Sequence, residues 1–401
     1  MENAHMPTAR LRSILCLAIA AVFAAAPAAN AQWGIFRMLE KPPVTSQAPK
    51  LMDRMVNLDD EQAVIVTSFQ QEAQAEYERV AAIWKEIRED AEQEARTSDD
   101  RTVWFELFAR PRDFEQRRAD IREDFMENAS LVIAADQQED FERFERRFFR
   151  QHLFGEAVSQ YGSVAGVTVD VEDVAESADL SDSARAAIEP TLVQYSREIH
   201  GELVSLKDAA DTNAEARMEA FEKMADGEGW DMELMSRGMD RIASLVEDIR
   251  QTNLTYERRI ANELSGDDRA EFQRVFNRTA FPGIYTDTAA TARFRAALGM
   301  ENLTDEQRAT LTELRTQFER EVSTVRQELR EAALEENPVE NMMRGGWGRG
   351  GDDEEEEEAR ETVNELSERF VQQIDALLTP NQRQTLGEND PTDWRTRSFD
   401  P

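Results

Sequence analysis

The stretches Leu303-Thr304-Asp305-Glu306-Gln307 and Leu378-Thr379-Pro380-Asn381-Gln382 share the pattern L-T-x-x-Q and begin 75 residues apart. Thr-x-x-Gln is the sequence of a capping box. In this arrangement the Thr hydroxyl accepts a hydrogen bond from the third following backbone N–H, and the Gln side chain reaches back to the cap. Pro380 stands at the first helical position, where its missing N–H costs nothing. Each stretch therefore predicts the start of a helix.

Related stretches occur earlier in the chain, so that the motifs form three pairs. Leu58-Asp59-Asp60-Glu61-Gln62 is a close variant, and Ile133-Ala134-Ala135-Asp136-Gln137 follows it after 75 residues as a degraded copy. Leu180-Ser181-Asp182-Ser183-Ala184 and Leu264-Ser265-Gly266-Asp267-Asp268 are weaker echoes, 84 residues apart. The residues that we assign to these helix caps are Leu58, Asp59, Gln62, Leu180, Ser181, Leu264, Ser265, Leu303, Thr304, Gln307, Leu378, Thr379 and Gln382.

Apolar residues recur at steps of three and four after the first motif of each pair, which is the spacing of one helix face. A second such run leads into the second motif, and it includes Phe370 and Ile374 in the third pair and Phe125 and Ala129 in the first. The first runs are Val66, Phe69, Ala73, Tyr77, Val80 and Trp84; Ile188, Leu192, Tyr195, Ile199, Leu203 and Leu206; and Leu311, Leu314, Phe318, Val322, Val325 and Leu329.

These patterns predict an all-α fold of three tandem helical-hairpin repeats, each a long helix, a loop, a second long helix and a short helix. We expect the repeats at residues 49–160, 175–285 and 290–388, and a tail at 389–401. Asp352–Glu358 is an unbroken acidic run after a glycine-rich stretch, so we expect a disordered loop over about 338–358.

The first 31 residues have the composition of a secretory signal peptide. Arg10 and Arg12 precede an apolar run, and Ala29-Asn30-Ala31 has the small residues of a cleavage site. We therefore expect cleavage after Ala31, a linker at 32–48 and a periplasmic mature protein without an integral membrane segment. The only cysteine, Cys16, lies inside the expected signal peptide, so the mature chain would have no thiols.

The composition excludes several classes of function. The formal net charge is −35, with 82 acidic against 47 basic residues, and such a field repels nucleic acid. His152 and His200, the histidines of the mature chain, have no second histidine at metal-ligand spacing. The acidic run lacks the spaced ligands of a calcium loop. Because no phosphate loop or nucleophile motif is present either, we expect neither enzyme activity nor a cofactor or metal site.

Paired L-T-x-x-Q motifs on helical hairpins behind a signal peptide resemble the Spy/CpxP group of periplasmic proteins. The resemblance is carried by Leu303, Thr304, Gln307, Leu378, Thr379 and Gln382, then by Leu58 and Gln62, with Ser181 and Ser265 as weak echoes. It implies a small all-helical protein that acts as an ATP-independent chaperone, an inhibitor of envelope stress signalling or a periplasmic metal sensor. Family members hold one motif pair and dimerise, whereas this chain holds three pairs and is strongly acidic.

Three functions remain open at this stage. The first is a non-enzymatic binding protein of the chaperone or envelope-stress-sensor kind, with unfolded or envelope proteins as partners. The others are a structural or scaffolding protein of the envelope and a metal-responsive sensor that uses carboxylates. For the first, we expect client contacts on an arginine–aromatic helix, at Phe141, Phe144, Arg146, Arg147, Phe148 and Arg150. Ordinary core packing with snorkelling arginines is the competing interpretation of these six residues.

Overall fold

The computed structural model describes residues 41–97, 111–154, 158, 164–225, 232–335 and 354–388. All of the regular structure in these residues is α-helical apart from short helical turns, and no strand occurs among them. The chain divides into two compact units. Unit 1 comprises Met1–Ser159 with Leu203–Gly238, and unit 2 comprises Gln160–Glu202 with Met239–Pro401. The expected all-α fold is therefore confirmed, whereas the signal peptide and the tail lie outside the described residues.

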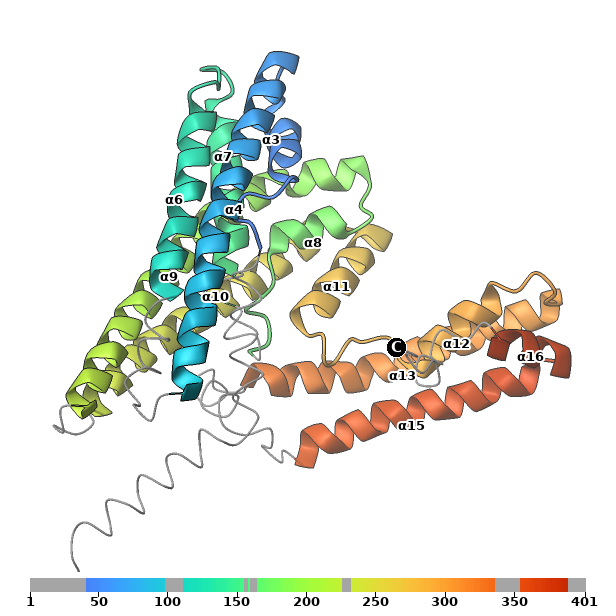
Figure 1. The fold of residues 1–401 in the computed structure, drawn as a ribbon. Helices are drawn as coiled ribbons and strands as arrows, with labels where there is room; N and C mark the ends of the chain where they lie inside the picture. Colours follow the sequence, from blue (N-terminus) through green and yellow to red (C-terminus); the bar gives the residue numbers. More distant parts are fainter. Residues whose placement is uncertain are drawn as a thin grey trace, which may run out of the picture. The chain divides into compact units, whose positions relative to one another are not determined.

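Each motif pair belongs to a segment in which a short helix precedes two long helices and a second short helix (Figure 1). The first segment has α3 (Ala48–Val56), α4 (Asp60–Thr97), α6 (Pro111–Ser130) and α7 (Gln138–Leu153). The second has α8 (Val171–Ser177), α9 (Asp182–Ala225), α10 (Met232–Glu263) and α11 (Gly266–Ala280). The third has α12 (Ala289–Leu298), α13 (Asp305–Glu335), α15 (Glu354–Leu377) and α16 (Pro380–Glu388).

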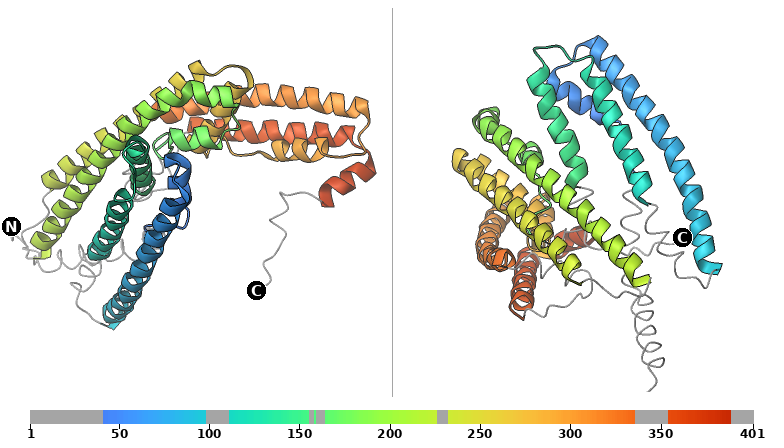
Figure 2. Two further views of the ribbon diagram at one scale, coloured as in Figure 1. Left: turned by 90° about the horizontal axis from the view of Figure 1, so that it is seen from above. Right: turned by 90° about the vertical axis from the view of Figure 1, so that its left-hand side faces the viewer.

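The apolar runs face the cores, as their spacing predicts. In α13, Leu311, Phe318 and Val322 are at most 4% exposed, and α4 buries Val66 and Tyr77 in the same way. The long helices of the third hairpin run side by side in opposite directions (Figure 2). Burial of the two facing stripes is what holds such a hairpin together, because isolated helices gain little stability from propensity alone.

Two sequence-based expectations about local structure are wrong. Of the loop expected over about 338–358, residues 338–353 lie outside the described residues, and Glu354–Glu358 form the start of α15 instead. Acidic residues are favourable at a helix N-terminus, so a run of glutamates there is compatible with helix formation. The short helix before each hairpin was not expected either. Helix α8, for example, begins at Val171, before the expected start of the second repeat at residue 175.

Candidate functional site

The two motifs of the third hairpin meet through the side chains of Gln307 and Gln382. Each glutamine closes its own capping box, in which Oε1 accepts from the backbone N of Thr304 or Thr379 at 3.0 and 2.9 Å. The amide nitrogen of each then donates to the Oε1 of the other, at 3.1 and 3.3 Å. Gln307 also donates to the Leu377 carbonyl at 2.8 Å. We call this arrangement the glutamine junction.

The first hairpin has a glutamine junction of the same kind. Gln62 and Gln137 exchange amide hydrogen bonds at 2.8 and 3.2 Å. Gln62 closes a capping box with Asp59 and donates to the Val132 carbonyl at 2.7 Å, whereas Gln137 donates to the Asn57 carbonyl at 3.0 Å. The side chains therefore satisfy carbonyls at the helix ends and also tie the start of the hairpin to its end.

The second pair lacks both glutamines and uses a shorter bridge. Asp268, at the position that Gln382 holds in the third pair, accepts from the backbone N of Ser181 at 2.8 Å and from its hydroxyl at 2.9 Å. Ser181 caps α9 through the Ala184 N–H at 3.3 Å. Ser265 occupies the N-cap position of α11, as predicted, but it makes no side-chain cap hydrogen bond.

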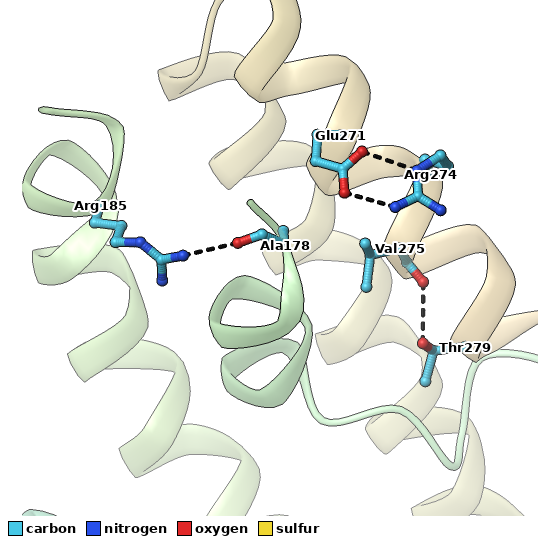
Figure 3. A network of polar contacts seen from close by, with 6 residues as sticks. All are labelled: Ala178, Arg185, Glu271, Arg274, Val275 and Thr279. Carbon is cyan, nitrogen blue, oxygen red and sulfur yellow. Dashed lines mark hydrogen bonds and ion pairs between the residues drawn. The ribbon is translucent and has the colours of Figure 1, made fainter. Parts of the chain in front are cut away.

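An arginine just after a first motif binds the end of the preceding short helix in the second and third segments. Arg185 donates to the Ala178 carbonyl at 2.8 Å, at the C-terminal end of α8 (Figure 3). Arg308 likewise donates to the Leu298 and Met300 carbonyls after α12, at 2.9 and 3.1 Å. Figure 3 also shows the pair formed by Glu271 and Arg274 on α11. Cations are favourable at helix C-termini, which explains this use of arginine.

The expected client contact on α7 is not a free surface. Phe141, Phe144 and Phe148 are at most 3% exposed and belong to the core of unit 1. Their spacing places them on one helix face, and Phe148 lies 5.7 Å from the ring of Phe125. Arg147 and Arg150 are also buried, and the side chain of Arg146 is 20% exposed. The competing interpretation, core packing with arginine stems along apolar surface, describes this helix, so we do not retain the six residues as a contact site.

An exposed apolar surface occurs instead on α4. Ile83 is 59% exposed and Ile87 is 38% exposed, and the partly buried Val80 lies on the same face because the three residues are spaced by three and four. We call these three residues the α4 flank. The third hairpin has Glu328 and Ala332 at the offsets of the two isoleucines. This difference between the hairpins is the signal in the sequence for an exposed apolar face on α4.

In unit 2, two arginines of α13 hold the third hairpin against the second segment. Arg330 donates to Asn277 Oδ1 at 3.0 Å and reaches the buried carboxylate of Glu257 at 3.5 Å. Its guanidinium carbon lies 5.0 Å from the centre of the Phe281 ring. One turn earlier, Arg326 donates to the Thr286 carbonyl at 2.7 Å. We call this set of contacts the arginine joint.

The core of the second hairpin holds a polar network. The Tyr195 hydroxyl donates to Asn253 Oδ1 at 3.0 Å and accepts from the Val171 N–H at 3.0 Å. The neighbouring Tyr256 donates to Glu198 at 2.6 Å. Burial, with the hydrogen bond to the Glu198 carboxylate, raises the pKa of Tyr256 to about 12. Burial also raises the pKa of Glu202 above its ordinary value. Each of these groups has a partner, so the network stabilises the hairpin and presents no reactive group.

Within the described ranges, no group of three or more His, Cys, Asp and Glu side chains could hold a metal ion. None of the helices described combines the length and the apolar content that crossing a bilayer requires. Comparison with known proteins gives no match to a family model, to a curated protein or to a solved structure.

Proposed function

We propose that the protein is a non-enzymatic binding protein of the periplasm that holds apolar segments of unfolded or envelope proteins without ATP. The observation that carries this proposal is the α4 flank. Two large aliphatic side chains one turn apart are exposed on a long helix whose other large apolar residues, apart from Val64, are buried or partly buried. Exposed apolar surface of this kind marks sites of interaction in soluble proteins.

The repeated design of the segments supports the same proposal. The first and third motif pairs close by a glutamine junction, and the second pair closes by a Ser–Asp bridge. We infer that the segments are copies of one packing unit and that the chain is Spy/CpxP-like. Tandem copies would then supply within one chain the several hairpins that such proteins obtain by dimerisation, and an array of units offers an extended surface for an unfolded chain.

The test is suppression of the thermal aggregation of an unrelated protein in the absence of ATP. Suppression is expected at a few-fold molar excess, and the double variant Ile83→Ser/Ile87→Ser is expected to lose most of it. Val64→Ser is the matched control, because Val64 is 70% exposed on the same helix but lies roughly 30 Å away along its axis. Absence of suppression by the wild-type chain, or equal loss in both variants, would overturn the proposal.

A structural role in the envelope is the second candidate, and the arginine joint favours it. The joint fixes the third hairpin on α10 and α11 through charged, aromatic and backbone contacts, which is what a spacer of defined geometry requires. A specific partner captured by the native chain and lost in an Arg330→Ala variant would support this role. Unchanged capture by the variant would count against it.

A further inference from the structure

The apolar face of the third hairpin is covered by α12, a helix of ten residues that lies along α13 and α15 (Figure 1). Phe294 of α12 is 2% exposed, and its ring centre lies 5.9 Å from that of Phe318 and 6.4 Å from that of Phe370. Ala290 and Ala297 are fully buried on the same face. The hairpin thus binds an amphipathic helix in a groove, with anchors at positions i, i+4 and i+7.

The first hairpin covers the equivalent position with a different helix. Phe125 and Phe370 stand at the same distance before their second motifs. In the first hairpin, Phe148 of the long trailing helix α7 contacts Phe125 at 5.7 Å, and α3 packs against α7 and α4. In the third, the trailing helix α16 is described only to Glu388, and it is the leading helix that supplies the aromatic ring. The first and third hairpins therefore both have a covered apolar face, and the helix that covers it differs.

Charge favours a basic occupant. Helix α12 carries Arg293 and Arg295 and no acidic residue, whereas acidic residues outnumber basic ones in both α13 and α15. Arg293 donates to Asp375 of α15 through two nitrogens, at 2.7 and 3.0 Å. A partner helix with an arginine beside its aromatic anchor would make the same pair.

The buried anchors of α12 cover little apolar area of the hairpin. Two of its three buried anchors are alanines, which bury little apolar area. A ten-residue helix spans roughly 15 Å, less than half the length of the 31-residue α13. Leu314, Val325 and Val371 of the hairpin are only partly buried. A longer amphipathic helix could therefore cover apolar surface of the hairpin that α12 leaves partly exposed.

We propose that α12 is an internal occupant of a helix-binding groove on the third hairpin, and that the groove exchanges it for basic amphipathic helical segments of partner proteins. The proposal rests on the proposed function and narrows its partner class from apolar segments in general to helices with an aromatic anchor and a neighbouring arginine. It also provides regulation, because a site whose competent state is only partly populated binds more weakly than an open one.

The test uses the full mature chain and a fluorescein-labelled peptide with the sequence of residues 288–300. In Ala290→Cys/Ser367→Cys a disulfide would lock α12 in place, since the Ala290 N–H donates to Ser367 Oγ at 2.9 Å. Cys16 is the only cysteine in the sequence, so the new pair has no competing thiol in the mature chain. Fluorescence anisotropy is expected to show peptide binding to the reduced form and a loss of at least tenfold in affinity on oxidation.

A second variant weakens the binding of α12 in the groove. Phe294→Ala is expected to bind the peptide at least tenfold more tightly than the wild-type chain, whereas Arg295→Ala, which removes a 68% exposed side chain of the same helix, is expected to change the affinity less than twofold. Far-UV circular dichroism checks that both variants fold. If Phe294→Ala does not fold, the comparison of oxidised and reduced forms decides alone.

Equal peptide binding by the oxidised and reduced forms would overturn the groove proposal, as would absence of binding to a folded Phe294→Ala variant. Aggregation assays on the same samples separate this result from the proposed function. If the oxidised form still suppresses aggregation and binds the peptide as well as the reduced form does, the groove proposal falls and the proposed function stands. If the peptide displaces α12 but the wild-type chain does not suppress aggregation, the proposed function falls and helix binding in the groove stands.

Discussion

Gln307 and Gln382 lie 75 residues apart, and each donates its side-chain amide to the oxygen of the other. Each side chain thereby closes a capping box and crosses to the opposite helix start. Each motif glutamine thus makes a tertiary contact in addition to its local capping contact. The junction joins the start of α13 to the start of α16 and, through the Leu377 carbonyl, to the end of α15. It therefore fixes the register in which the two apolar stripes face each other.

Replacing Gln307 by Ala removes its capping-box contact and its three contacts across the junction. We expect a loss of roughly 2 kcal/mol in the free energy of unfolding, since a net hydrogen bond contributes about 1 kcal/mol and an unpaired carbonyl adds a penalty. Urea unfolding followed by circular dichroism measures the loss. Gln317→Ala is the control, because Gln317 is exposed on the same helix and donates to Glu321, one turn further along it. Equal destabilisation by the two variants would contradict the role of the junction.

The arginine joint should be worth more than a surface ion pair. Arg330→Ala leaves the Glu257 carboxylate, which is 3% exposed, without its guanidinium partner, and we expect a cost of about 3 kcal/mol. Arg315→Ala breaks the exposed pair with Glu319 on the same helix and should cost at most about 0.5 kcal/mol. The midpoints of urea unfolding compare the two variants directly. A small effect for Arg330→Ala would show that the joint does not hold the hairpin.

Ionisation of Tyr256 should lower the stability of the fold at alkaline pH. Its folded-state pKa of about 12 exceeds the unfolded value near 10, so its contribution to stability is complete below about pH 10 and is lost as the pH rises through about 12. Absorbance at 295 nm should therefore show a tyrosine that ionises late, and Tyr256→Phe should remove that late step. Ionisation of every tyrosine near pH 10 in the folded protein would refute the assignment.

Two helical glycines should respond to alanine in opposite directions. A Cβ at Gly238 would lie 2.1 Å from Asn213 Oδ1 and 3.3 Å from Asn213 Cβ, so Gly238→Ala forces a buried side chain to move. We expect a cost of about 1–3 kcal/mol. A Cβ at Gly201 has no neighbour within 4 Å, and Gly201→Ala should stabilise the helix by about 0.5–1 kcal/mol. Thermal unfolding of the two variants checks the sign, and a shift in the same direction for both would contradict the packing.

The long helices could be predicted from the sequence because their apolar residues recur over many turns. Leu311, Phe318 and Val322 lie on one side at the helical period, and all three are buried. Capping boxes could also be predicted, because their partners, such as Thr304 and Gln307, are close together in the sequence. The crossing of Gln307 to Gln382 could not, because a local pattern carries no information on which helix ends meet.

The short leading helices and the candidate site were harder to predict. Helix α8 has seven residues, too few turns for a period to be distinguished from a loop, and it depends on Arg185 and on Tyr195 for its position. The α7 phenylalanines were assigned to a client surface because spacing shows that they share a face but not which face is covered. For Ile83 and Ile87 the sequence shows only that the third hairpin has Glu328 and Ala332 at the same offsets, and their exposure depends on what packs against α4.

The most direct measurement of the central claim is site-specific photo-crosslinking to an unfolded protein. A photo-reactive amino acid at Ile83 is compared with the same residue at Val64, which is somewhat more exposed on the same helix. The account predicts cross-links from Ile83 to the unfolded protein, none to its native form, and few from Val64. Cross-links of equal yield from both positions, or none from Ile83, would contradict the proposal that the α4 flank binds unfolded chains.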